Sequence, residues 1–216
     1  GCSGEINWAP RAYHSGDFEE IAWMLSRLRQ QHSGPIYAVG ISLGGNALMR
    51  WAGEMGHAAA QVVNGVVSVC SPVDLTASGH AIDTGLNKAI YARMFLATMK
   101  PRAMQKLQQF PGLFDPLELM AANTLYAFDN VFTAPLHGFR GTDDYWDRAS
   151  AKPGLTRVQV PALVLNARND PFIPASSLPT QDQVSDHVTL WQPNTGGHVG
   201  FASGRFPGDL KEMPWA

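Results

Sequence analysis

The fold of this chain is decided by residues 36–46, which read IYAVGISLGGN. Residues 36–41 form a short apolar run, long enough for a buried β-strand, and residues 46–55 have the pattern of a helix. Between them, Gly40-Ile41-Ser42-Leu43-Gly44 matches G-x-S-x-G at a strand-to-helix turn. The motif alone is weak, because Gly and Ser are common residues. Its position between a strand and a helix makes it a strong indication of a nucleophile elbow.

Ser42 at such a turn is a candidate nucleophile, because a sharp turn presents the hydroxyl to a base. Gly40 and Gly44, two residues before and after it, are expected to avoid a clash at the turn. The Leu43 N–H falls at the start of the helix, where it can donate to a tetrahedral oxyanion. The alternative is an ordinary turn in which Ser42 only caps the helix.

An activated serine needs a base and an acid that orients the base. The chain has seven histidines, and only His198, in PNTGGHVGF, lies in a glycine-rich loop after the last predicted strand. A solvent-facing loop histidine is the alternative interpretation. Asp170, in NARNDPF, follows the third predicted strand and is the favoured acid. Asp74, in SPVDL, follows the second strand, and we interpret it instead as a helix cap.

The remaining pattern predicts an α/β protein with a mostly parallel sheet and helices on both of its faces. Further strands are expected at 62–70, 160–166 and 187–192, and a helix at 15–31. The long stretch between the second and third strands is predicted to be a helical cap, with one helix at 84–99 and a second starting at Pro101. We therefore divide the chain into a core segment (1–76), a helical cap (77–150) and a second core segment that carries the candidate acid and base (151–216).

The composition excludes several classes of protein. The 216 residues are 45% hydrophobic and 16% charged with a net charge of −2, which argues against a disordered chain and against nucleic-acid binding by bulk charge. No apolar run is long enough for a transmembrane helix. The two cysteines, Cys2 and Cys70, suggest neither a disulfide framework nor a zinc site. We found no metal-ligand spacing, and the expected chemistry requires no cofactor.

Six segments together resemble the YheT-like branch of the α/β-hydrolases, which also includes the eukaryotic α/β-hydrolase-domain membrane lipases. The resemblance covers nearly the whole chain and implies a carboxylic-ester hydrolase with Ser42 as nucleophile, Asp170 as acid and His198 as base. It also implies that the helical insertion caps the active site. The segments are GCSGEIN (1–7), PRAYHSG (10–16), VGISLGGN (39–46), HGF (137–139), NARNDPF (166–172) and GGHVGF (196–201).

The resemblance carries further expectations. Members of this family have a segment before GCSGE that supplies the first strands and a second oxyanion donor, so we expect this chain to be part of a longer protein. The edge of strand 36–41 would then be exposed. The expected partner is a small-molecule ester with an apolar acyl chain, and the expected location is the cytoplasm, with a membrane anchor in the preceding segment left open. Two alternatives stay open: an acyltransferase with the same triad, and a non-catalytic hydrolase-fold binding protein.

Overall fold

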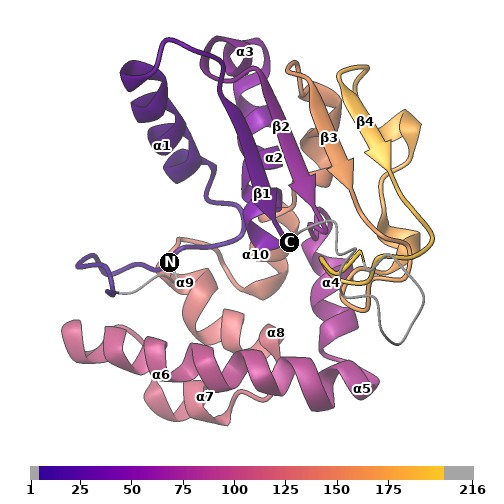
Figure 1. Cartoon of the computed structure of the whole chain (residues 1–216). Helices are drawn as coiled ribbons and strands as arrows, with labels where there is room; N and C mark the ends of the chain where they lie inside the picture. The colour runs from indigo at the N-terminus through magenta and orange to yellow at the C-terminus, as the bar shows by residue number, and fades with distance from the viewer. Residues whose placement is uncertain (1–4, 202–216) are drawn as a thin grey trace, which may run out of the picture.

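The computed structural model describes residues 5–201 and has a four-stranded sheet at its centre (Figure 1). The strands lie in the order β1-β2-β3-β4, and all neighbours are parallel. This confirms the predicted α/β class. The strands are β1 (Tyr37–Ile41), β2 (Gly65–Val69), β3 (Ala162–Leu165) and β4 (Val188–Trp191).

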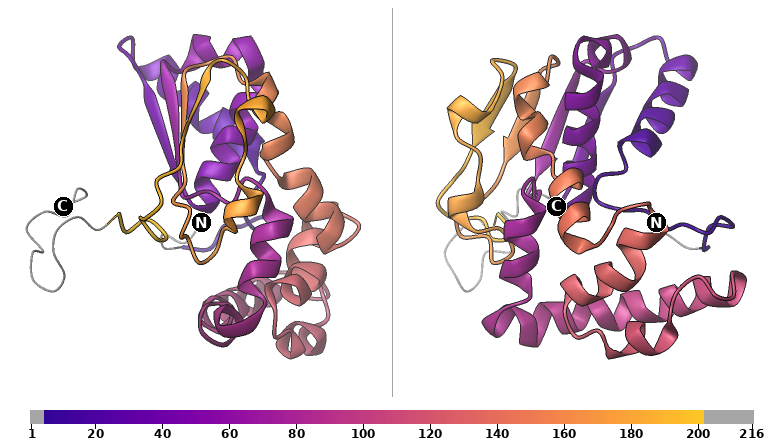
Figure 2. Two further views of the ribbon diagram at one scale, coloured as in Figure 1. Left: turned by 90° about the vertical axis from the view of Figure 1, so that its right-hand side faces the viewer. Right: turned by 180° about the vertical axis from the view of Figure 1, so that it is seen from behind.

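One face of the sheet carries the main hydrophobic core. Val66, Val164 and Val188 point from the strands toward Met49 and Trp51 of the central helix, and all five side chains are buried. The layer of helices on this face is visible edge-on in Figure 2. It consists of α1 (Phe18–Gln31), α2 (Leu43–Met55), η1 (Gly56–Ala58), α3 (Ala59–Val62) and η4 (Lys152–Arg157).

The other face differs from the prediction. Helices were expected on both faces, but among residues 5–201 they pack against only one. On the opposite face of β1, which lies at the edge of the described sheet, Tyr37, Val39 and Ile41 are exposed. The expectation arose because the predicted strands alternate with helices, a pattern typical of a parallel sheet with helices on its faces.

A cap of helices lies beyond the carboxyl ends of the strands (Figures 1 and 2). Its core includes Leu96, Ala103, Leu119, Phe128 and Phe132. In the described part of the chain, no helix combines the length and apolar character needed to cross a membrane. The helices from β2 to η4 are α4 (Leu75–Ile82), α5 (Gly85–Asn87), η2 (Lys88–Ala92), α6 (Arg93–Gln109), α7 (Pro116–Ala121), α8 (Leu125–Phe128), η3 (Asp129–Thr133), α9 (Ala134–Leu136) and α10 (Thr142–Ala149).

Two local predictions were wrong. Pro101 does not begin a helix but lies inside α6, where Leu96 and Ala103 on either side of it are both buried in the cap core. Burial of one continuous apolar face therefore outweighs the backbone hydrogen bond that proline cannot donate. The predicted strand 62–70 is shorter, because Val62 still belongs to α3.

The short turns η5 (Ala175–Ser177) and η6 (Gln181–Gln183) complete the described elements. The boundaries 1–76, 77–150 and 151–216 remain a prediction.

Candidate active site

Ser42 lies at a strained turn between β1 and α2. Its backbone angles are φ 52° and ψ −124°, a region that residues other than glycine rarely adopt. The Ser42 N–H donates to the Val69 carbonyl at 2.9 Å, and the Ser42 carbonyl accepts from the Gly45 N–H at 3.0 Å. These bonds from β2 and α2 hold the turn in place. Strain of this kind is found where a side chain must be presented for chemistry.

The glycines around Ser42 allow β1 and α2 to approach each other closely. A Cβ at Gly40 would lie 2.6 Å from the Gly44 carbonyl oxygen. A Cβ at Gly45 would lie 1.8 Å from Ser71 Oγ. A Cβ at Gly44 would meet nothing within 4 Å, so the steric reason given for that glycine from the sequence was wrong. The second close approach is at Gly45, which follows the G-x-S-x-G pattern and was not singled out.

The structure brings Ser42, His198 and Asp170 together from three separate loops. His198 Nε2 lies 3.1 Å from Ser42 Oγ, and His198 Nδ1 lies 2.8 Å from Asp170 Oδ2. The Asp170 side chain has no exposed surface, and its Oδ1 accepts from the Phe172 N–H at 2.8 Å. An ionised carboxylate can only accept, so this network places the histidine proton on Nδ1 and leaves Nε2 to accept from the serine hydroxyl.

Asp74, the alternative acid, lies elsewhere. It is the N-cap of α4, where its Oδ1 accepts from the Ala77 N–H at 3.0 Å. Its Oδ2 lies 3.7 Å from Lys152 Nζ. The interpretation of Asp74 as a helix cap is therefore confirmed.

Three residues that the sequence analysis did not single out hold the His198 loop. Asn169 Oδ1 accepts from the Gly197 N–H at 2.8 Å. Cys70 Sγ accepts from the Val199 N–H at 3.3 Å, and burial raises the pKa of this thiol. The Phe172 ring centre lies 4.5 Å from that of His198. No local pattern identifies them, because each contact joins loops that follow different strands.

Leu43, whose N–H is predicted to donate to an oxyanion, lies at the start of α2. Leu43 is the first residue of α2, so its N–H has no acceptor inside the helix. Leu43 and Ser42 both line the same cavity, and the helix adds its positive end there. Among residues 5–201, no group of three His, Cys, Asp or Glu side chains is arranged to hold a metal ion.

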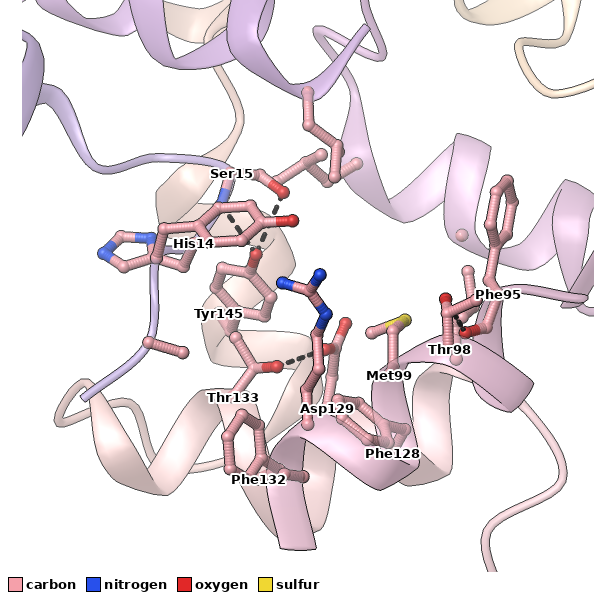
Figure 3. Close-up of a pocket in the computed structure, with 18 of the residues that line it drawn as sticks. His14, Ser15, Phe95, Thr98, Met99, Phe128, Asp129, Phe132, Thr133 and Tyr145 are labelled. Carbon is pink, nitrogen blue, oxygen red and sulfur yellow. Dashed lines mark hydrogen bonds between the residues drawn. The ribbon is translucent and has the colours of Figure 1, made fainter. Parts of the chain in front are cut away.

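A large cavity of about 1100 Å³ runs from this site into the cap. Ser42 and His198 line it together with many apolar side chains of the cap and of the loop after β3 that carries Asp170. Figure 3 shows the cap side of the cavity, where Asp129, Thr133 and Tyr145 are among the labelled residues with polar side-chain groups. The apolar lining includes Met94, Phe95, Met99, Phe128, Phe132 and Ile173.

Comparison with known proteins gives a consistent result. A family model described as "alpha/beta hydrolase fold" matches residues 1–204. The chain is 34% identical over 207 residues to YheT of Escherichia coli (strain K12), a match that covers 94% of this chain and 60% of that protein. It is 28% identical to phospholipase ABHD3 of Mus musculus, with 96% and 50% covered, and 26% identical to monoacylglycerol lipase of Saccharomyces cerevisiae, with 95% and 47% covered.

These matches confirm the resemblance and the fold that were expected from the sequence. The chain spans 60% of the length of YheT and about half of the length of the other two relatives.

Proposed function

We propose, from the premise that the chain belongs to the α/β-hydrolase fold family, that it is a serine hydrolase of carboxylic esters. The observation that carries the proposal is the continuous hydrogen-bond chain from Ser42 through His198 to the buried Asp170. Ser42 and His198, at one end of this hydrogen-bond network, line an apolar cavity. Such a cavity suits an ester with an apolar acyl chain. The names of the phospholipase and lipase relatives support the same class of substrate.

The first step of the proposed reaction is acylation. Ser42 Oγ attacks the ester carbonyl carbon while His198 Nε2 accepts the hydroxyl proton. Asp170 holds the imidazole in the required tautomer and stabilises the imidazolium that forms. The Leu43 N–H donates to the oxyanion of the tetrahedral intermediate. His198 then gives its proton to the leaving alcohol, and an acyl-enzyme remains on Ser42.

The second step is deacylation by water. His198 takes a proton from a water molecule, which attacks the acyl carbonyl, and the proton returns to Ser42 Oγ as the acid leaves. These two steps use the ester, water and groups of the protein. The cytoplasmic location implied by the resemblance stays a prediction.

Hydrolysis of p-nitrophenyl esters tests the proposal. Ser42→Ala should abolish release of p-nitrophenol, because the variant lacks the hydroxyl that lies 3.1 Å from His198 Nε2. Ser33→Ala, in the exposed loop before β1, is the matched control and should hydrolyse the esters like the wild type. Equal hydrolysis by the wild type and Ser42→Ala, with both proteins folded, would contradict the proposal.

A further inference from the structure

A carboxyl group, that of Asp129, lines the cavity among residues of the cap (Figure 3). Asp129 begins η3, and its Oδ1 accepts from Thr133 Oγ1 at 2.6 Å (Figure 3). Its Oδ2 accepts from Trp146 Nε1 at 2.9 Å. Each carboxylate oxygen can accept two bonds, so Asp129 keeps unused acceptor capacity that faces the cavity. Burial raises the pKa of this carboxyl to about 6, because it outweighs the opposite effect of the hydrogen bonds from Thr133 and Trp146.

A second polar group of the cavity wall, the Ser78 hydroxyl, has no hydrogen-bond partner at all. Ser78 of α4 lines the cavity and is only 2% exposed, and its Oγ has no hydrogen-bond partner. A buried hydroxyl without a partner costs stability, so it calls for a specific explanation. Ser68 Oγ is also buried and unpartnered, but it lies in β2 and is not among the residues that line the cavity.

The indole ring of Trp146 contacts both Asp129 and the part of α4 next to Ser78. The Trp146 ring packs against the backbone of α4 at Gly79, where a Cβ would lie 2.4 Å from Cη2. The same ring donates from Nε1 to Asp129. Asp129 and Gly79, the residue after Ser78, therefore both contact the Trp146 ring, and Asp129 and Ser78 line the same cavity.

The charges and hydroxyls of several other lining residues are already used within the protein. Arg11 forms an ion pair with Asp17 at 2.5 Å. Lys106 Nζ lies within hydrogen-bond distance of four oxygens, two of them from Asn7. The Tyr145 hydroxyl donates to Ser15 Oγ at 3.0 Å. Asp129 and Ser78 differ from these groups in having capacity left for a ligand.

We propose that Asp129 and Ser78 form a subsite that binds a hydroxyl group of the substrate. This inference rests on the proposed esterase function and names its substrate class: esters that carry a hydroxyl group in addition to an apolar chain. The hydroxyl donates to the Asp129 carboxylate and accepts from the Ser78 hydroxyl, while the chain packs on the apolar wall. The hydroxyl belongs either to the alcohol part of the ester or to its acyl chain.

Two substrate pairs distinguish these sources. Glyceryl monolaurate against propyl laurate tests a hydroxyl on the alcohol part, and methyl hydroxylaurate against methyl laurate tests one on the acyl chain. We expect the wild-type protein to prefer the hydroxylated member of one pair by about tenfold or more in kcat/KM, since a hydrogen bond to a buried charged group is worth about that much. Equal kcat/KM within both pairs would overturn the proposal.

Two variants test the residues. Asp129→Asn and Ser78→Ala should each bring the preference toward parity while hydrolysis of propyl laurate and methyl laurate continues. Ser68→Ala is the matched control for Ser78→Ala, because it also removes a buried unpartnered hydroxyl but not one that lines the cavity, and it should keep the preference. If Ser68→Ala and Ser78→Ala reduce the preference equally, the subsite is wrong.

A binding measurement separates the subsite from the catalytic proposal. Calorimetric titration of the Ser42→Ala protein with hydroxylauric acid and with lauric acid requires no turnover. Tighter binding of hydroxylauric acid that disappears in the Ser42→Ala, Asp129→Asn double variant supports the subsite even if no ester is hydrolysed. Ester hydrolysis without any hydroxyl preference, together with equal binding of the two acids, overturns the subsite and leaves the proposed function standing.

Discussion

Asp170 and Asp74 both follow a parallel strand, but only Asp170 contacts a histidine. Asp170→Asn should therefore lower kcat about a thousandfold or more, because the amide no longer fixes the productive tautomer of His198. Asp74→Asn should leave kcat unchanged, because asparagine caps a helix about as well as aspartate. Ester hydrolysis by the two purified variants checks this pair. Equal losses of kcat in both would contradict the assignment of the acid.

The same residues show what the sequence could predict about the site. Ser42 and Asp170 each lie within a few residues of the end of a predicted strand, and His198 lies in the loop after the last one. Parallel strands bring these ends to one edge of the sheet, so local patterns were sufficient. The contacts of Cys70 and Phe172 with the histidine loop could not be predicted, because they depend on how loops distant in the sequence meet.

At the scale of elements, the packing of α2 on β1 gives a matched pair of glycine substitutions. Gly45→Ala should lower the free energy of unfolding by about 1–3 kcal/mol, because its Cβ would overlap Ser71 Oγ and crowd Gly40. Gly44→Ala should be neutral or stabilise α2 by up to about 1 kcal/mol, because its Cβ faces open space and alanine favours helix. Urea unfolding of both variants measures the difference. A larger loss in Gly44→Ala than in Gly45→Ala would contradict the packing.

The cap helices were harder to predict than the strands. Local chemistry favours Pro101 at a helix start, but α6 continues through it because residues on both sides pack into the cap core. The polar subsite gave no signal either, since Asp129 lies in an aromatic-rich stretch without a recognisable motif. Trp146, which donates to Asp129, comes from α10, and only tertiary packing brings α10 to η3.

At the scale of the whole molecule, stability should depend on pH through His14, at the junction of core and cap. Burial, followed by the nearby His137, lowers the pKa of His14 from 6.5 to about 4. Between these values the unfolded chain binds more protons than the folded one, so stability falls as the pH drops from about 6.5 to about 4. Because His14 is half-buried, we expect this loss to be about 2 kcal/mol at most.

The variant His14→Gln isolates this contribution. Glutamine keeps an acceptor for the Gly16 N–H, which donates to His14 Nδ1 at 3.2 Å, but it does not titrate. Relative to the wild type, the variant should be more stable at about pH 4.5 than at about pH 7.5, as measured by urea unfolding at both values. An identical stability difference at the two pH values would show that His14 does not titrate in this window.

Asp129 should give the stability a pH dependence opposite to that from His14. Its pKa is raised by burial from 3.8 to about 6, so the folded protein binds more protons in this interval and stability falls as the pH rises through it. Asp129→Asn removes this penalty, and its stability relative to the wild type should be greater at about pH 7.5 than at about pH 4, by about 3 kcal/mol. Urea unfolding measures this difference. A pH-independent difference would contradict burial of the carboxyl.

The central claim is that Ser42 is an activated nucleophile, and covalent labelling tests it most directly. The protein is treated with a fluorophosphonate probe, digested, and mapped by mass spectrometry, with Ser42→Ala treated in parallel. We predict a single phosphonylated peptide that contains Ser42 in the wild type and no labelled peptide in the variant. Labelling at another serine, or no labelling of the folded wild-type protein, would contradict the proposed mechanism.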